Sequence, residues 1–206
     1  CIPSPLPYGY RNHTRLAVDD ARQAGYRTAR SHAIVPVARC PVLETSLESD
    51  LAEAAKGRID FVPGDEIELR AWDGAIAIGA EVYQVSDGAF FQANSSVAEQ
   101  LVEALLASMK LAGTERVLEL FCGVGLFTVP MARRARQVLG VEGNAVAVAD
   151  ARANLKRAGL AEVATAIAAD CFAWSRRVEA RSSIASAIGT ATIAGFRTPS
   201  RSSPTL

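Results

Sequence analysis

The sequence lacks any apolar run near the roughly 18 residues that a membrane-spanning helix needs. It also lacks an N-terminal pattern of positive charge followed by an apolar segment, so we expect no secretory signal. Its four cysteines, Cys1, Cys40, Cys122 and Cys171, contain no Cys-x-x-Cys pair and are too sparse for a disulfide scaffold. These absences predict a soluble cytoplasmic protein with reduced thiols and no membrane partner.

Net charge is also missing, because 22 basic residues balance 22 acidic ones. Overall charge therefore neither favours nor excludes a nucleic-acid partner. The first forty residues nevertheless hold a basic excess against only Asp19 and Asp20. The arginines concerned are Arg11, Arg15, Arg22, Arg27, Arg30 and Arg39. This excess indicates either a phosphate-binding face or a solvated strand edge, and charge alone favours the second.

The first half of the sequence is typical of antiparallel β-structure. Four short runs of strand-forming residues lie at 15–18, 33–37, 66–71 and 80–85. Turn residues separate them, namely Asp19, Asp20 and Gly25 after the first run and Asp73-Gly74 between the last two. We therefore expect a small, mostly antiparallel β domain over residues 1–88.

Two segments have the spacing of a helix capping box. They are Thr45-Ser46-Leu47-Glu48 and Ser96-Val97-Ala98-Glu99. The first predicts a helix over 47–56, and the second predicts a longer helix that Gly113 ends.

The pattern changes near residue 95 to strands that alternate with helices. The expected elements are a strand at 116–121, a helix at about 126–136, a strand at 137–141, a helix at 145–158 capped by Asn144, and a strand at 163–168. This alternation predicts a parallel sheet with helices packed against it, that is, an α/β domain over 89–174. We expect the domain boundary between 85 and 95.

The last part of the sequence, residues 175–206, breaks this alternation. It holds seven serines and five arginines but only one acid, Glu179. Such a bias predicts a low-complexity, disordered tail. A tail after only three parallel strands suggests a change of reading frame or a degenerate gene end, and the start without methionine suggests a fragment.

The turn after the 116–121 strand predicts a ligand site. Gly123-Val124-Gly125 would place backbone N–H groups and a helix N-terminus at the carboxyl end of the sheet. Glu142 closes the next strand 17 residues after Gly125, at a separation typical of an acid that accepts hydrogen bonds from ribose hydroxyls. Thr128 stands where a dinucleotide fingerprint has its third glycine, which disfavours nicotinamide and flavin cofactors. Glu119 followed by Phe-Cys-Gly-x-Gly favours S-adenosylmethionine (SAM), and a turn without ligand is the alternative.

Five motifs in order resemble those of the RNA uracil-C5 methyltransferases. They are Pro7-Tyr8-Gly9-Tyr10-Arg11-Asn12, Val37-Ala38-Arg39-Cys40-Pro41-Val42-Leu43, Phe90-Phe91-Gln92-Ala93-Asn94, Leu118-Glu119-Leu120-Phe121-Cys122-Gly123-Val124-Gly125 and Val141-Glu142-Gly143-Asn144-Ala145. The resemblance covers about residues 3–172. It implies an incomplete Rossmann-like class I SAM-dependent methyltransferase domain, and formation of 5-methyluridine in ribosomal or transfer RNA.

The resemblance also implies the site residues. The cofactor contacts would be Gln92, Phe121, Gly123, Gly125, Leu126, Glu142 and Asp170. Among these, Glu142 would bind ribose and Asp170 would lie near the adenine. Leu126 stands where relatives often have Asn, so a side-chain hydrogen bond is lost there. The resemblance makes Arg11, Arg15, Arg27 and Arg30 better candidates for RNA backbone contacts than charge alone does.

Some relatives hold a four-iron cluster with four cysteines, and Cys40-Pro41 resembles the fourth position. One thiolate cannot hold such a cluster, and Cys1 does not restore the missing spacing. We therefore expect Cys40 to be an orphaned iron–sulfur ligand without a cluster. A small, buried hydrophobic residue is the alternative.

In the family mechanism, a cysteine thiolate adds to C6 of uracil and a carboxylate removes the C5 proton. The segments that supply these groups have no counterpart before Leu206. Cys122 and Cys171 do not lie in the nucleophile motif, so we assign no catalytic residue. The sequence thus predicts a truncated SAM-dependent methyltransferase, with a non-catalytic RNA-binding or scaffolding fragment as the alternative and no evident protein partner. An unrelated nucleotide-dependent enzyme is disfavoured by Thr128.

Overall fold

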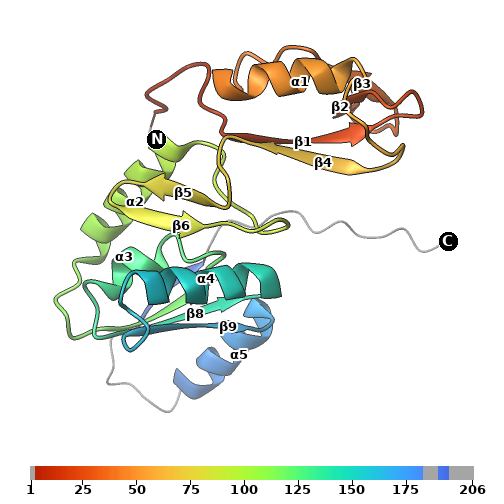
Figure 1. The fold of residues 1–206 in the computed structure, drawn as a ribbon. Helices are drawn as coiled ribbons and strands as arrows, with labels where there is room; N and C mark the ends of the chain where they lie inside the picture. The colour runs from red at the N-terminus through yellow and green to blue at the C-terminus, as the bar shows by residue number, and fades with distance from the viewer. Residues whose placement is uncertain (1–2, 183–189, 195–206) are drawn as a thin grey trace. The chain divides into compact units, whose positions relative to one another are not determined.

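The computed structural model describes residues 3–182 and 190–194, and side chains up to residue 176 (Figure 1). The chain divides into two compact units that interleave in sequence: residues 1–79 with 92–101, and residues 80–91 with 102–206. The single domain boundary that the sequence predicts between residues 85 and 95 does not match this division. The reason is that the segment after Gly79 forms hydrogen bonds with the α/β unit, through residues such as Gln84.

The first unit is built on an antiparallel sheet with the order β3-β2-β1-β4. These strands are β1 (His13–Val18), β2 (Ala24–Arg27), β3 (Ile34–Pro36) and β4 (Glu66–Arg70). A short 3-10 turn, η1 (Thr45–Leu47), leads into α1 (Glu48–Ala55), which lies over the sheet in Figure 1. Leu16, Val18, Leu43, Leu47 and Leu51 form the core between them. The predicted antiparallel β-structure is confirmed.

Strand β2 contains Gly25, which the sequence analysis treated as a turn residue. In the structure Gly25 pairs with Pro36 and Ala17. A Cβ atom at this position would overlap the backbone carbonyl of Val35. Glycine is therefore needed for the close approach of β3, and its presence does not mark a turn.

Neither predicted capping box forms as such. Leu47 occupies the N-cap position of α1 without a side-chain hydrogen bond. Helix α2 (Ser95–Met109) is capped by Asn94, whose Oδ1 accepts the Val97 N–H at 3.0 Å. Between these helices lie β5 (Ala75–Ile78), which the sequence analysis missed, and β6 (Glu81–Gln84).

The second unit contains a parallel sheet with the order β10-β7-β8-β9. Its strands are β7 (Arg116–Leu120), β8 (Gln137–Glu142), β9 (Ala164–Ala168) and β10 (Thr190–Ala194). Helices α3 (Thr128–Ala132) and α4 (Ala145–Arg157) pack against the sheet, and so does α5 (Cys171–Ser182). The predicted parallel sheet with packed helices is confirmed, and the domain is Rossmann-like.

Helix α4 begins as the sequence predicts. The Asn144 side chain accepts hydrogen bonds from the N–H groups of Val146 and Ala147, at 2.9 and 3.4 Å. Helix α3 is shorter than predicted, because only residues 128–132 are α-helical within the expected 126–136.

The predicted disordered tail needs correction over two stretches. Helix α5 continues to Ser182, and β10 pairs in parallel with β7 from Thr190↔Arg116 to Ala194↔Leu120. The edge of β7 offers backbone N–H and C=O groups for hydrogen bonding. Pairing with this edge gives the backbone groups of β10 hydrogen-bond partners, and this does not depend on the Ser- and Arg-rich composition of the segment. Residues 183–189 and 195–206 of the predicted tail lie outside the described residues. Within the described part of the chain, each helix is too short or too polar to span a membrane.

Candidate cofactor-binding site

The candidate site is centred on the turn between β7 and α3, residues 121–126, which we call the cofactor turn. Three of its residues have left-handed backbone angles: Phe121 at φ +60°, Gly123 at +54° and Gly125 at +90°. A Cβ atom at Gly123 would meet nothing within 4 Å. Glycine is thus favoured at 123 by the backbone conformation, and the space beside this residue is open.

Glu142 lies at the end of β8 and holds the turn from one side. Its Oε2 accepts the Gly123 N–H at 3.0 Å, and its Oε1 accepts the Asn144 N–H at 2.9 Å. An ionised carboxylate has about four acceptor positions, so capacity remains for hydroxyl donors of a ligand. The structure thus brings together Glu142 and Gly123, which the sequence predicts to belong to one ligand site.

Phe121 is held by the first turn of α5. Its N–H donates to the Cys171 Sγ at 3.4 Å, and this thiol donates to the carbonyl oxygen of Val141 at 3.2 Å. The Phe121 ring meets the Phe172 ring edge-on, with 5.5 Å between centroids. A left-handed conformation costs a non-glycine residue roughly 1 kcal/mol, and these contacts offset that cost.

Two carbonyl groups of the cofactor turn accept hydrogen bonds from side chains far away in sequence. The Val124 carbonyl accepts from Asn154 Nδ2 at 2.9 Å, and the Leu126 carbonyl accepts from the Tyr83 hydroxyl at 3.1 Å. The Leu126 side chain itself is buried. Asn154 and Tyr83 could not be predicted from the sequence, because neither lies in a motif.

Glu119 is buried in β7 beneath the turn. Its Oε2 accepts a hydrogen bond from Thr128 Oγ1 at 2.6 Å. Burial raises the pKa of Glu119 to about 8, so the carboxyl group is largely protonated at neutral pH. In the sequence, Thr128 is notable only because it stands where a dinucleotide fingerprint has a glycine. In the structure, its hydroxyl group gives the buried carboxyl group of Glu119 a hydrogen-bond partner.

Asp170 follows β9, so its main chain lies at the same edge of the sheet as the ends of β7 and β8. Its Oδ1 accepts the Ala173 N–H at 2.8 Å and so caps α5. The Asp170 side chain is exposed. Its expected place near an adenine stays a prediction.

Gln92 belongs to the first unit. The side-chain amide of Asn12 donates through Nδ2 to the main-chain carbonyl of Gln92 at 3.1 Å and to Ser95 Oγ at 2.9 Å. Asn12 is buried, so these bonds fix the backbone of the Phe-Gln-x-Asn segment. The expected contact between the Gln92 side chain and the cofactor stays a prediction.

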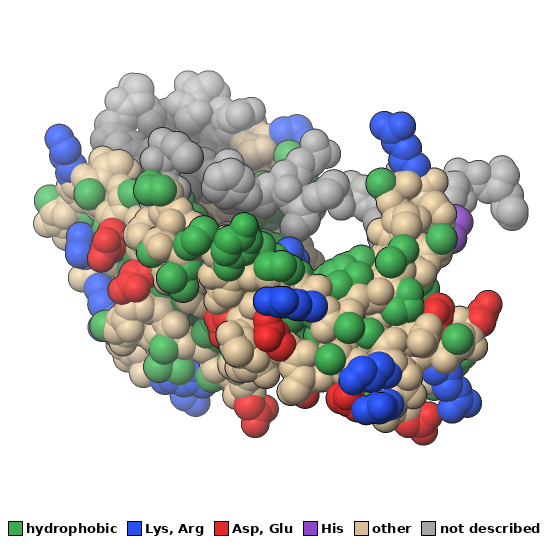
Figure 2. All heavy atoms as spheres, turned by 90° about the horizontal axis from the view of Figure 1, so that it is seen from above, with side chains coloured by type: hydrophobic (Ala, Val, Ile, Leu, Met, Phe, Trp, Pro, Cys, Tyr) green, Lys and Arg blue, Asp and Glu red, His purple; other side chains and the backbone are tan. Residues whose placement is uncertain are grey.

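In the fold, acidic side chains of β4 offset part of the positive charge of the N-terminal arginines. Arg15 lies 3.6 Å from Glu68 and Arg27 lies 3.8 Å from Glu66, nitrogen to oxygen, and both acids come from β4. Arg30 is exposed, and Arg11 Nε donates to the carbonyl of His13. On the face shown in Figure 2, basic and acidic side chains are interspersed.

Cys40 is half-buried and packs against the core of the first unit. Among the described residues, no group of three or more His, Cys, Asp or Glu side chains is placed to hold a metal ion. A four-iron cluster needs several thiolates, so the residues described do not fit one. The role of Cys40 as an orphaned ligand stays a prediction.

Comparison with known proteins adds three findings. The family model described as tRNA (Uracil-5-)-methyltransferase matches residues 73–176. The 23S rRNA (uracil(1939)-C(5))-methyltransferase RlmD of Pectobacterium atrosepticum is 30% identical, over 76% of this chain and 47% of the relative. The corresponding Salmonella typhimurium protein is 29% identical, over 79% of this chain and 50% of the relative. The chain therefore spans about half the length of the curated relatives it matches.

The fold is also similar to a solved structure. This is the Pyrococcus abyssi tRNA (uracil-54, C5)-methyltransferase in complex with S-adenosyl-L-homocysteine, with a TM-score of 0.60 and 20% identity. The match covers 82% of this chain and 57% of that one. At this level of identity the likeness shows a shared fold.

Proposed function

Since the chain belongs to the tRNA (uracil-5-)-methyltransferase family, we propose that it binds SAM and contributes to methylation of C5 of uracil in RNA. The observation that carries this proposal is the pair formed by Glu142 and Gly123, a fixed carboxylate beside an open glycine turn. The names of the relatives support RNA as substrate, since they specify 23S rRNA and tRNA. An RNA of either kind would place the reaction in the cytoplasm.

The residues of the cofactor turn fit such a ligand. Glu142 would accept hydrogen bonds from the ribose hydroxyls, because an ionised carboxylate is an acceptor only. Gly123 leaves room for the ligand where a side chain would stand. Phe121, Gly125, Leu126, Asp170 and Gln92 complete the proposed cofactor contacts. The bound cofactor would supply a methyl group on a positively charged sulfur.

The cysteines of the second unit do not suit the role of nucleophile. Burial raises the pKa of both the Cys122 and the Cys171 thiols. The thiolate is the reactive form, and a raised pKa makes it scarce at neutral pH. We assign neither residue a catalytic role.

Titration calorimetry of the 206-residue chain with SAM and with NAD tests the cofactor. We expect heat of binding with SAM and none with NAD. Binding of NAD without SAM would overturn the proposal. The RNA-binding or scaffolding alternative would be favoured if RNA bound with a steep salt dependence and SAM did not bind.

A further inference from the structure

Helix α4 carries two polar side chains that are almost completely buried, Asp150 at 1% exposed and Asn154 at 2%. They are four residues apart, so they lie one above the other on the same face of the helix. Buried polar groups destabilise a fold unless they are hydrogen-bonded, which makes their partners informative. Both side chains bind the segment that begins with β6, but only one of them reaches the cofactor turn.

Asn154 joins three segments of the second unit through one amide group. Its Oδ1 accepts the Gln84 N–H at 2.7 Å, and its Nδ2 donates to the Gln84 carbonyl at 3.1 Å. The same Nδ2 donates to the Val124 carbonyl at 2.9 Å. Both hydrogens of the amide are therefore used, one on β6 and one on the cofactor turn.

Asp150 binds the β6 segment in a similar way but does not reach the turn. Its Oδ1 accepts from Gln84 Nε2 at 2.8 Å and from Ser86 Oγ at 2.7 Å. Its Oδ2 accepts the Ser86 N–H at 2.7 Å. Asp150 and Asn154 thus form a matched pair, because both fix β6 and only Asn154 contacts Val124.

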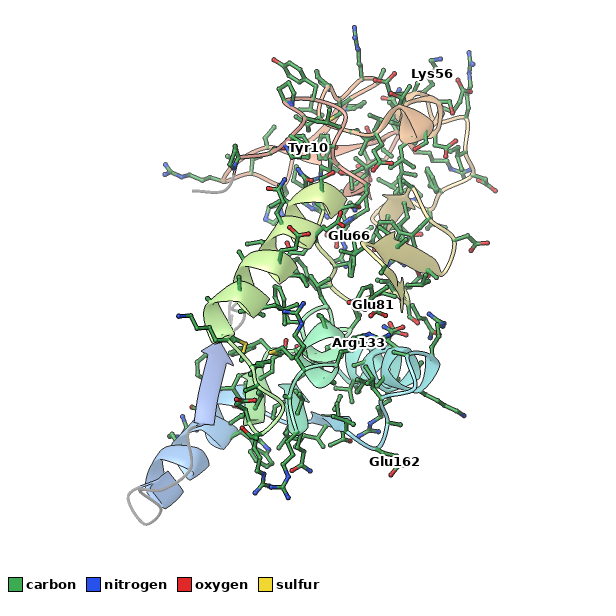
Figure 3. All side chains as sticks on the ribbon, turned by 90° about the vertical axis from the view of Figure 1, so that its left-hand side faces the viewer. Tyr10, Lys56, Glu66, Glu81, Arg133 and Glu162 are labelled. Atoms are coloured by element: carbon green, nitrogen blue, oxygen red, sulfur yellow. The ribbon has the colours of Figure 1, made fainter. Side chains whose placement is uncertain are left out.

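Strand β6 is also attached to the other end of the turn. The Tyr83 hydroxyl donates to the Leu126 carbonyl, and Tyr83 is buried. Glu81 forms an ion pair with Arg133 just after α3, with Arg133 Nη2 at 3.1 Å from Oε2 (Figure 3). The strand is therefore a fixed support to which the carbonyls of Val124 and Leu126 are tied.

We infer that Asn154 is a positioning residue for the cofactor. By holding the Val124 carbonyl, its amide sets the orientation of the peptide group between Val124 and Gly125, which forms part of the proposed SAM site. Asn154 acts through the turn and does not itself touch the cofactor. This inference rests on the proposed function of the turn.

The test compares Asn154→Asp with the control Asp150→Asn. Asn154→Asp keeps the side-chain shape and the acceptor for Gln84 N–H, but it removes both N–H donors. We expect the affinity for SAM, measured by calorimetry, to fall about tenfold, the loss typical of one hydrogen bond. Asp150→Asn should lower the melting temperature and leave the SAM affinity within about twofold of wild type. Asn154→Ala serves as a second variant if Asn154→Asp does not fold.

The inference is overturned if the Asn154 variants bind SAM as wild type does, or if all variants lose affinity in proportion to their loss of stability. Amide hydrogen exchange of the free protein separates this inference from the proposed function. Residues 123–126 should exchange faster in the Asn154 variants and at the wild-type rate in Asp150→Asn. If the wild type binds no SAM, the proposed function fails, and unchanged exchange at 123–126 in the Asn154 variants would still refute the positioning role.

Discussion

The Glu142 carboxylate accepts the backbone N–H of Gly123 at 3.0 Å, across 19 residues of sequence. This bond joins the end of β8 to the turn that follows β7. It holds an acid and an open glycine side by side at the edge of the sheet where α/β proteins bind ligands.

Replacement of Glu142 by Gln should weaken SAM binding. Gln keeps the size of the side chain but removes the charge and one acceptor oxygen. Since a hydrogen bond to a charged group contributes about 1.5–3 kcal/mol, we expect the affinity measured by calorimetry to fall by roughly 10- to 100-fold. Glu162→Gln, an equal charge change at an exposed acid before β9, is the control. Equal affinities for the two variants would show that Glu142 does not bind the cofactor.

The buried acid Glu119 should make stability depend on pH. The unfolded chain loses this proton above its ordinary pKa of 4.5, whereas the folded protein keeps it up to about 8. The free energy of unfolding therefore falls as pH rises through this window. Glu119→Gln stays neutral and retains an acceptor for Thr128. It should be similar to wild type near pH 5 and more stable by about 4 kcal/mol near pH 8.

Urea denaturation at these two pH values measures the effect of Glu119. If the stability difference between wild type and Glu119→Gln stayed constant with pH, the acid would not titrate as the burial requires.

Gly140 in β8 should not tolerate a side chain. A Cβ atom there would lie 2.8 Å from Cys122 Sγ and 3.1 Å from its Cβ. We expect Gly140→Ala to lower the free energy of unfolding by about 1–3 kcal/mol, because overpacking shifts the neighbouring backbone. Adding Cys122→Ala removes the sulfur and should restore part of the loss. Strictly additive effects of the two changes in denaturation experiments would contradict this contact.

The thiols should differ in reactivity. Cys40 is half-buried, whereas Cys122 and Cys171 are buried and burial raises the pKa of both. In the native protein we expect iodoacetamide to label Cys40 well before Cys122 and Cys171, as followed by peptide mass spectrometry. All three should react once the chain is unfolded in urea. Fast native labelling of Cys171 would mean that its thiol is accessible and would reopen its role as a nucleophile.

The arginines of the first unit should contribute unequally to RNA binding. Arg30 is exposed, whereas Arg15 already lies beside Glu68. If this surface contacts the RNA backbone, Arg30→Ala should reduce the slope of log affinity against log salt by about one. Arg15→Ala should change the slope less. Filter binding of a uridine-containing RNA at several salt concentrations measures both, and unchanged slopes would exclude these residues as phosphate contacts.

Much of the second unit could be predicted from sequence, because its signals are local. The alternation of strands and helices, the Asn144 cap and the glycine turn each depend on residues close to one another in the chain. The position of Glu142 at the end of the strand after the turn could be predicted for the same reason. In contrast, Gly25 and the 175–182 stretch were predicted wrongly, because Gly25 pairs within a strand and α5 continues through 175–182.

The sequence by itself determined the order of the elements from β7 to β9, the turn that marks the candidate site and the family of the chain. Only the tertiary structure decided how the turn is held. Thr128 donates a hydrogen bond to buried Glu119, and the Phe121 N–H donates to Cys171. Asn154 donates to the carbonyl groups of both Val124 and Gln84. Asn154 lies 30 residues from Val124 and 70 from Gln84. Hydrogen bonds over such separations leave no periodic or local signal, because they exist only when folding buries both partners together.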